Sequence, residues 1–417
     1  MWWKKMVSVL LVAAMMTGAI SCGKSNSSKR ESGVDPETAP HISLALRSGV
    51  YSDAIQSCLA DFERENQVIC DVYDFGEEEL HSGILEDATN AEGKYDLCMV
   101  DGSWKAELTT ENVLLNLSAE GYELDDDIIE ATKTICYGEG NLYIAPYYGN
   151  VTVLLFNKDL VAKAGFKGEE LSSLEAIKDV CKVTKEKGNL GFMYRGDSPN
   201  NYVVDFLPIL CSFGGWVVDE NNKPTVNTKE FKDAMNFYLE LIATGKSESR
   251  DDLIIAIANG AAAMAVGWPG WYTPTTRSSS DYVAIHGRVT DDAVEYNANV
   301  YGIWTIGIPK NSTNKEMAIK LLKYLMDPEV QKNTIEYGGV PCRYSSLTDE
   351  KILADNPPFK AVCTALENGV YRPVMKEWPS FYTILGNEME KIISGEKSVD
   401  AGLEDAQKEL EEMLENS

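Results

Sequence analysis

The strongest constraint on the fold is a strand–helix–strand rhythm that begins at Ile42. Residues 42–46, 68–73 and 96–100 are short apolar runs typical of strands, and apolar residues recur at helical spacing between the first two. Strands that alternate with helices in this way pair in parallel, so the sequence predicts an α/β fold. Ligands of such sheets bind at the carboxyl ends of the strands, which here carry residues 47–51 and 101–104.

The rest of the chain continues the same alternation. Residues 142–157 read as two strands, and we predict that an irregular loop at 146–150 separates them because Pro146 is excluded from the middle of a sheet. Strands are also predicted at 261–271, where the strand runs into a Gly/Pro loop, and at 304–309. Helices are predicted at 158–163, 229–242 and 315–326, with a last helix capped by Ser398.

The N-terminus has the pattern of an export signal. Lys4 and Lys5 precede an apolar run of about 11 residues and then small residues up to Cys22, and the run is too short for the roughly 20 residues of a spanning helix. Cys22 resembles the lipidated cysteine of a bacterial lipobox, although Ala19 stands where that motif usually has Leu. The resemblance implies cleavage of 1–22 and an exported lipoprotein held at the membrane through Cys22. The alternative is a secretory peptide with an incidental cysteine.

Charge limits the partners of the exported chain. The formal net charge is −27, and it becomes −29 when the signal and its two lysines are removed. Such a charge repels nucleic acids and anionic lipids, so we expect a neutral or cationic small ligand. Residues 23–40 are polar and Ser-rich, which predicts a flexible tether between the anchor and the fold.

Cysteine usage does not indicate a metal site. None of the nine cysteines forms a close pair of the metal-binding type, and several lie in apolar runs. We predict that the eight after Cys22 are mostly free, buried thiols, with disulfides as the alternative in an oxidising compartment. We expect no metal and no cofactor.

Five segments in order resemble the extracellular solute-binding proteins of family 1, the maltose-binding-protein-like lipoproteins that capture carbohydrates for ABC importers. The segments are 95–101, 142–147 with 154–160, 260–265 with 267–269, 307–310 with the helix up to 329, and 341–343 with 395–399. The resemblance implies two α/β lobes, each a mixed, mainly parallel sheet flanked by helices, that close on a ligand by hinge motion. It assigns 42–118 plus 305–345 to lobe one and 119–304 plus 346–417 to lobe two. It also implies a monomer that hands a sugar to a membrane permease and is not an enzyme.

A sugar site needs aromatic rings for the C–H faces and polar groups for the hydroxyls. Several tryptophans follow Gly or Pro in loops instead of lying in periodic core runs. The candidate ligand-binding residues are Trp268, Trp271, Trp104, Trp304, Trp216, Trp378, Tyr51, Tyr147, Tyr148, Asn150, Asp101 and Arg343. Residues 147–150 lie in the loop that the resemblance assigns to ligand contact, but they depart from the family pattern. The identity of the ligand therefore does not follow from the resemblance.

Two other functions stay open. A binding protein for another solute, such as a polyamine, suits the negative charge and the many aromatics. An exported glycoside hydrolase needs only two carboxylates, but the chain has no nucleophile elbow, phosphate loop or zinc-protease motif, and its three histidines lie outside any motif. The acidic runs 77–79 and 125–127 are interpreted as solvated faces.

Overall fold

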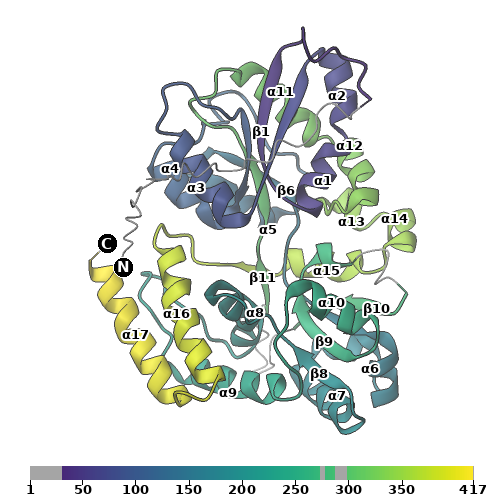
Figure 1. Cartoon of the computed structure of the whole chain (residues 1–417), viewed down its shortest axis with the longest axis vertical. Coiled ribbons are helices and arrows are strands. Elements are labelled where there is room, and N and C mark those ends of the chain that lie inside the picture. Colours follow the sequence, from purple (N-terminus) through teal and green to yellow (C-terminus); the bar gives the residue numbers. More distant parts are fainter. Residues whose placement is uncertain (1–30, 273–277, 287–297, 417) are drawn as a thin grey trace, which may run out of the picture.

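The chain forms two lobes that meet at a narrow waist (Figure 1). This computed structural model describes residues 31–272, 278–286 and 298–416. The predicted signal peptide, Cys22 and the first part of the tether lie outside the described residues. The end of the predicted tether is already folded, because the backbone N–H groups of Thr38 and Ala39 donate to the carbonyl of Asp35. Among the described residues, no helix combines the length and the apolar character that a membrane crossing requires.

The first lobe contains the predicted strand–helix–strand unit. Its sheet has the order β2(Ile69–Phe75), β1(His41–Arg47), β3(Leu97–Asp101), β12(Trp304–Gly307) and β6(Ile144–Tyr148). The pairs of β1 with β2 and with β3 are parallel, as predicted, whereas β12 runs antiparallel to both β3 and β6. The helices of this lobe are α1(Val50–Gln56), α2(Leu59–Asn66), α3(Glu77–Asp87), α4(Lys105–Thr110), α5(Glu130–Lys133), α11(Lys315–Leu325) and α12(Pro328–Thr334).

The structure corrects the predicted break at Pro146 and the lobe boundary after residue 118. Pro146 lies inside β6 opposite Thr305, and β6 is an edge strand, where a missing N–H costs no ladder hydrogen bond. The chain leaves the sheet only at residues 149–152. The first lobe therefore continues beyond residue 118 through β6, together with the small hairpin β4(Tyr137–Gly138) and β5(Asn141–Leu142).

The second lobe is built on a four-stranded sheet with the order β10(Ser280–Val283), β7(Val153–Asn157), β9(Ala262–Gly267) and β8(Leu190–Met193). Only β8 and β9 are parallel, so the prediction of mainly parallel sheets is wrong for this lobe. Its helices include the predicted one at 229–242. They are α6(Lys158–Ala164), α7(Leu174–Glu186), α8(Pro199–Ser212), α9(Lys229–Ile242), α10(Arg250–Ala258), α16(Trp378–Ile393) and α17(Val399–Glu415).

The C-terminal part divides between the lobes. Helix α16 packs on α8 and α17 packs on α9, as predicted for the second lobe, and the Ser398 hydroxyl caps α17 by accepting from the backbone N–H of Ala401. The preceding helices α13(Tyr344–Leu347), α14(Glu350–Asp355) and α15(Phe359–Glu367) lie beside the first lobe and the waist in Figure 1. Phe359 and Val362 belong to the core that contains the first-lobe sheet. The allocation of all of 346–417 to lobe two is corrected accordingly.

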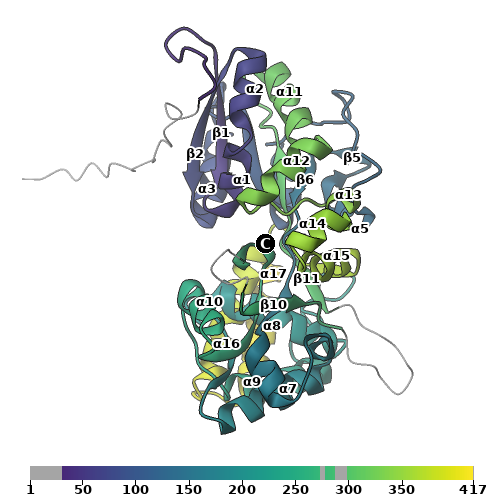
Figure 2. The same ribbon diagram turned by 90° about the vertical axis from the view of Figure 1, so that its right-hand side faces the viewer.

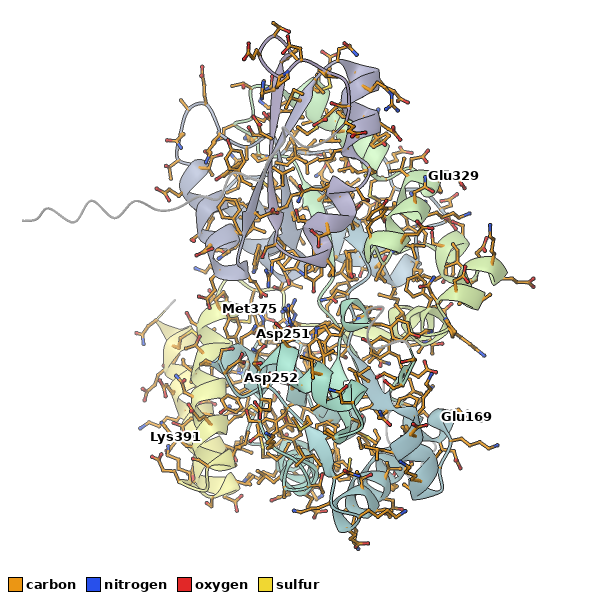
Figure 3. All side chains as sticks on the ribbon, turned by 45° about the vertical axis from the view of Figure 1, so that its right-hand side comes forward. Glu169, Asp251, Asp252, Glu329, Met375 and Lys391 are labelled. Atoms are coloured by element: carbon orange, nitrogen blue, oxygen red, sulfur yellow. The ribbon has the colours of Figure 1, made fainter. Side chains whose placement is uncertain are left out.

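Three chain segments cross the waist side by side. Residues 149–152 run next to β11(Asn299–Tyr301), which pairs with β13(Gly369–Tyr371). The N–H of Gly302 donates to the carbonyl of Asn150 at 2.9 Å, and the N–H of Thr152 donates to the carbonyl of Val300 at 2.9 Å. Short crossing segments of this kind are where a hinge absorbs rotation. Figure 2 shows the lobes above and below the waist. In Figure 3, Asp251 and Met375 lie near the junction, and Glu169 and Glu329 lie on outer edges.

The cysteines are packing residues. All eight from Cys58 to Cys363 are buried, and no disulfide joins any of them in the part of the chain that the structure describes. Burial raises the pKa of the Cys342 thiol to about 12. A thiol with so high a pKa is not a reactive thiolate at neutral pH.

Candidate ligand-binding cleft

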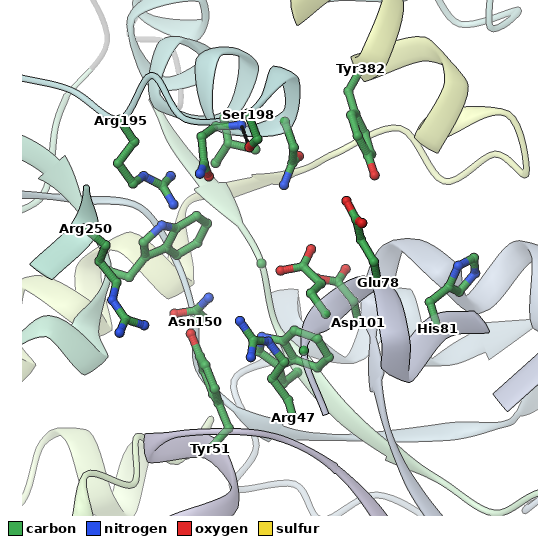
Figure 4. Close-up of a pocket in the computed structure, with 18 of the residues that line it drawn as sticks. Arg47, Tyr51, Glu78, His81, Asp101, Asn150, Arg195, Ser198, Arg250 and Tyr382 are labelled. Carbon is green, nitrogen blue, oxygen red and sulfur yellow. Dashed lines mark hydrogen bonds between the residues drawn. The ribbon is translucent and has the colours of Figure 1, made fainter. Parts of the chain in front are cut away.

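A cleft of about 910 Å³ lies between the lobes and receives side chains from both of them and from the C-terminal segment. Seven of the twelve sequence candidates line it, and they are Tyr51, Asp101, Trp104, Asn150, Trp268, Trp271 and Trp304. Figure 4 shows several of the lining side chains pointing toward a common space. The structure therefore brings together residues that are more than 200 positions apart in the sequence.

The first-lobe wall is built at the carboxyl ends of its parallel strands. Arg47 ends β1, the acidic run 77–79 begins α3 directly after β2, and Asp101 ends β3. Trp304 opens the antiparallel strand β12 opposite Asp101, so its indole reaches the same edge of the sheet. This placement agrees with the rule that the sequence analysis applied to residues 47–51 and 101–104.

The aromatic side chains of this wall hold one another in place. The rings of Trp104 and Trp304 meet edge to face at 5.4 Å, and Tyr51 lies 5.7 Å from Trp304 between ring centroids. The Arg47 guanidinium lies 5.9 Å from the centre of the Tyr51 ring. Burial raises the pKa of Tyr51 to about 12, so its hydroxyl is a hydrogen-bond donor at neutral pH. A ligand therefore meets an aromatic wall that is already assembled.

The second-lobe wall carries Trp268, which directly follows β9, and Trp271, which ends the 3-10 turn Pro269–Trp271. Pro269 at the first position of this turn fixes its entry. Gly302 allows the Trp268 ring to approach the crossing segment, because a Cβ at Gly302 would lie 2.8 Å from ring atom Cζ3. The Arg195 guanidinium lies 5.3 Å from the Trp271 ring. Both tryptophans are thus positioned by backbone and side-chain contacts.

Asp101 is tied to the C-terminal segment by a buried ion pair. The Nη2 group of Arg372 donates to both carboxylate oxygens of Asp101 at 2.7 Å, and the Ser103 N–H donates to Oδ1 at 2.9 Å. Burial opposes the charge on Arg372, but the Asp101 carboxylate raises the pKa of the guanidinium above its usual value. Because both oxygens of Asp101 already accept hydrogen bonds, little capacity is left for a ligand hydroxyl.

Asn150 is a polar side chain of the cleft with an unused hydrogen-bond acceptor. Its side chain is 5% exposed, and its Oδ1 accepts no hydrogen bond from any residue that the structure describes. Figure 4 shows its amide facing the cleft beside Tyr51. A buried carbonyl oxygen without a donor is costly, so a ligand hydroxyl or amine at this point recovers free energy.

The two tyrosines beside Asn150 lie outside the cleft lining. Tyr148 is fully buried beneath Tyr51, and its hydroxyl donates to the carbonyl of Gly338 at 2.8 Å. Tyr147 alternates to the opposite face of β6 and packs in the first-lobe core. The reason is that residues 147 and 148 belong to a strand and not to the predicted loop.

Arg343 is also placed away from the cleft, as a structural residue. It is buried, its Nη1 donates to Asp125 at 2.7 Å, and its Nε donates to Gln331 at 2.7 Å. The acidic run 125–127 is therefore in part an ion-pair partner, not a purely solvated face. Trp378 is buried in the second-lobe core and stacks on Phe381 at 5.5 Å, and Trp216 packs against the same core.

Sequence reasoning missed most of the charged lining. Glu77, Glu78 and Glu79 line the cleft, which corrects their interpretation as a solvated face, and their place directly after β2 was the available signal. Arg195 follows β8 and Arg250 is the first residue of α10, where no motif marks them. Arg372 and Tyr382 reach the cleft only because the C-terminal segment returns to the waist.

The family is established by direct comparison. The family model for bacterial extracellular solute-binding proteins matches residues 58–361 of this chain. The chain belongs to this family. The resemblance drawn from the five sequence segments is therefore confirmed at the family level, and the family name places this solute-binding protein outside the cytoplasm.

Individual relatives are distant in sequence and near in fold. The chain is 20% identical over 387 residues to the probable amino-acid ABC transporter periplasmic-binding protein y4oP of Sinorhizobium fredii, covering 89% of each chain. A solute-binding protein of Agrobacterium radiobacter K84 in complex with ribitol gives a TM-score of 0.78 at 22% identity, covering 91% of this chain and 100% of that one. Maltose-bound MalE3 of T. maritima gives 0.77 at 22% identity, covering 90% and 100%. These structures confirm the two-lobed fold.

Proposed function

We propose that this protein is the substrate-capturing component of an ABC importer and that it binds a sugar between its lobes. The observation that carries the proposal is the set of four tryptophans, Trp104, Trp268, Trp271 and Trp304, that line one cleft from two lobes. Aromatic faces on opposite walls suit a ring with apolar C–H faces. Hinge closure then brings the walls together around that ring.

Polar groups supply the second half of the proposed recognition. We expect Asn150 Oδ1 and the Tyr51 hydroxyl to form hydrogen bonds with ligand hydroxyls. Asp101 is expected to contribute less, because Arg372 already donates to both of its carboxylate oxygens. The volume of about 910 Å³ is near the upper end of small-molecule sites. This size favours an oligosaccharide over a single sugar ring.

The names of the relatives support the importer role, but they point to different classes of ligand. The Sinorhizobium relative is named as an amino-acid transporter component, whereas the two structures contain ribitol and maltose. The aromatic cleft is the reason that we choose a sugar. We further propose that Cys22 is lipidated and anchors the exported chain to the membrane, that the chain acts as a monomer, and that it performs no chemical reaction on its ligand.

A thermal-shift screen tests the proposal. The protein would be residues 22–417 carrying Cys22→Ser, and the panel would hold monosaccharides, oligosaccharides, polyols, amino acids and spermidine. A ligand present at about 1,000 times its dissociation constant adds about 4 kcal/mol to stability, which is readily seen in the melting curve. A shift with a sugar that is recovered unchanged supports the proposal.

The other outcomes separate the alternatives. A shift only with spermidine or amino acids overturns the sugar assignment and leaves a solute-binding protein for that class. Release of products from a glycan over time would instead indicate a glycoside hydrolase. The absence of a shift across the whole panel would also overturn the sugar assignment.

A further inference from the structure

We propose that the ligand carries a protonated amine, so that the preferred substrate is an amino sugar and not a neutral or acidic one. This inference rests on the proposed function and narrows it to one ligand chemistry. It rests on the charged side chains that line the cleft, on the ion pairs that some of them already form, and on the amide oxygen of Asn150, which has no donor among the described residues.

The arginines of the cleft are largely committed to protein carboxylates. Four arginines line the cleft, and three of them form ion pairs with residues of the protein. The pairs are Arg372 with Asp101, Arg250 with Asp251, and Arg195 with Asp205. A carboxylated sugar would have to compete with these partners, so the arginines do not form a ready anion site.

Arg47 is the fourth arginine, and it belongs to the aromatic wall. Its guanidinium lies 6.0 Å from the Trp304 ring, and its Nη1 donates to the Ser48 hydroxyl at 3.0 Å. Among the described residues, its hydrogen bonds all run from Nη1, and its Nε is buried without an acceptor. The remaining N–H groups of Arg47 are donors that a sugar hydroxyl can accept.

The carboxylates of the cleft are less well compensated. Glu77 and Glu78 line the cleft, and within the part of the chain that the structure describes neither forms an ion pair. Figure 4 shows the Glu78 carboxylate between Tyr382 and Asp101, facing the open space. Burial and the neighbouring Asp101 carboxylate raise the pKa of Glu77, although the Arg372 and Arg47 charges act in the opposite direction. A cation bound here would offset the repulsion between these carboxylates and stabilise their charged forms.

Asn150 is an independent indication of a donor-rich ligand. Its Oδ1 is an acceptor that is enclosed in the wall and has no donor among the described residues. Asn200, which lines the cleft from the second lobe, has a second buried acceptor, its Oδ1, that receives no hydrogen bond within the described ranges. An ammonium group has three donors and no acceptor, so it satisfies such oxygens better than a hydroxyl does.

The aromatic walls separate an amino sugar from a polyamine. Tyr51, Trp104 and Trp304 present rings that attract a cation as well as an apolar ring face. A linear polyamine satisfies the carboxylates but offers no ring to stack against these walls. An amino sugar uses both features, and for this reason we choose it over the polyamine.

Calorimetric titration with matched sugars tests the inference. The pairs would be glucosamine and glucose, galactosamine and galactose, mannosamine and mannose, and the deacetylated chitobiose and cellobiose, with the N-acetylated forms as a third arm. We expect the amine to bind about tenfold more tightly than its hydroxyl counterpart in at least one pair, a difference of about 1.4 kcal/mol. The N-acetylated form, which has no charge, is expected to lose that advantage.

The titrations distinguish failure of this inference from failure of the proposed function. If neutral sugars bind and no amine binds more tightly than its partner, this inference is overturned and the proposed function stands. If spermidine binds and no sugar does, both are overturned. If no sugar and no spermidine binds, both are overturned as well.

Variants locate the effect in the cleft. Glu77→Gln and Glu78→Gln are each expected to reduce the amine-to-hydroxyl affinity ratio toward one. Glu86→Gln is the matched control, because Glu86 lies on the same helix α3 and is exposed outside this cleft. An unchanged ratio in both cleft variants, with melting curves that show folded protein, would overturn the assignment to these carboxylates.

Discussion

Trp268 and Trp378 differ in role although both are almost fully enclosed. Trp268 is 8% exposed and Trp378 is 2% exposed, so burial alone does not separate them. Trp378 begins helix α16 and stacks on Phe381 within the second-lobe core. Trp268 follows the last residue of strand β9 and lines the cleft between the lobes. The difference teaches that the position directly after a strand of the sheet, and not exposure, separates the cleft-lining tryptophan from the core tryptophan.

Replacing the core tryptophan, Trp378, gives the largest expected effect. Trp378→Ala should lower the free energy of unfolding by about 3–5 kcal/mol, because it leaves a large cavity among buried residues. Chemical denaturation of the variant and the parent measures this difference. Trp216→Ala serves as the control, since Trp216 is only partly buried and its loss should cost less. Equal losses in the two variants would mean that Trp378 is not a core residue of the kind described.

Gly302→Ala tests how the cleft member is positioned. The added Cβ would lie 2.8 Å from the Trp268 ring, so the indole must move or the crossing segment must shift, at a cost of about 1–3 kcal/mol. We expect weaker sugar binding in calorimetry. Gly83→Ala on helix α3 is the control, because its Cβ meets nothing within 4 Å, and it should leave binding intact. Binding in Gly302→Ala that equals the parent's would contradict the contact between Trp268 and the crossing segment.

Glu77 offers the smallest expected effect and a test with a defined sign. Its pKa in the folded protein is raised above the usual 4.5 by burial and by Asp101, so the folded state favours the protonated carboxyl. The stability that protonation contributes is present below that usual pKa and is lost as the pH rises through the raised value. Glu77→Gln should therefore melt higher than the parent at neutral pH in the absence of ligand, with the difference shrinking toward about pH 4. A variant that melts lower at neutral pH would reverse this assignment.

The sequence predicted the elements of the fold where the signal was local. The helix Lys229–Ile242 and the strand before Trp268 follow from periodicity and from Gly/Pro punctuation, and the structure has them at those positions. Pro146 was misplaced because its tolerance depends on β6 being an edge strand, which is a property of the whole sheet. The antiparallel pairing of the second lobe has the same origin, since pairing direction is set by long-range contacts.

The site was most predictable for residues at or just after strand ends. Asp101, Trp104 and Trp268 could be named because each follows a recognisable strand. Arg372 could not, because it reaches Asp101 from 271 residues away along the chain. Trp378 was also a candidate, but it begins helix α16 with Pro379 in the first turn, and its ring stacks on Phe381 in the second-lobe core.

The most direct test of the central claim is a calorimetric titration of the Trp268→Ala/Trp271→Ala double variant beside the parent, with the sugar that gives the largest thermal shift. Each lost stacking contact should cost about 1 kcal/mol, so the dissociation constant should rise roughly 10- to 30-fold while the variant stays folded. That result would establish the cleft as the sugar site. An unchanged dissociation constant in a folded double variant would contradict the account and place the ligand elsewhere.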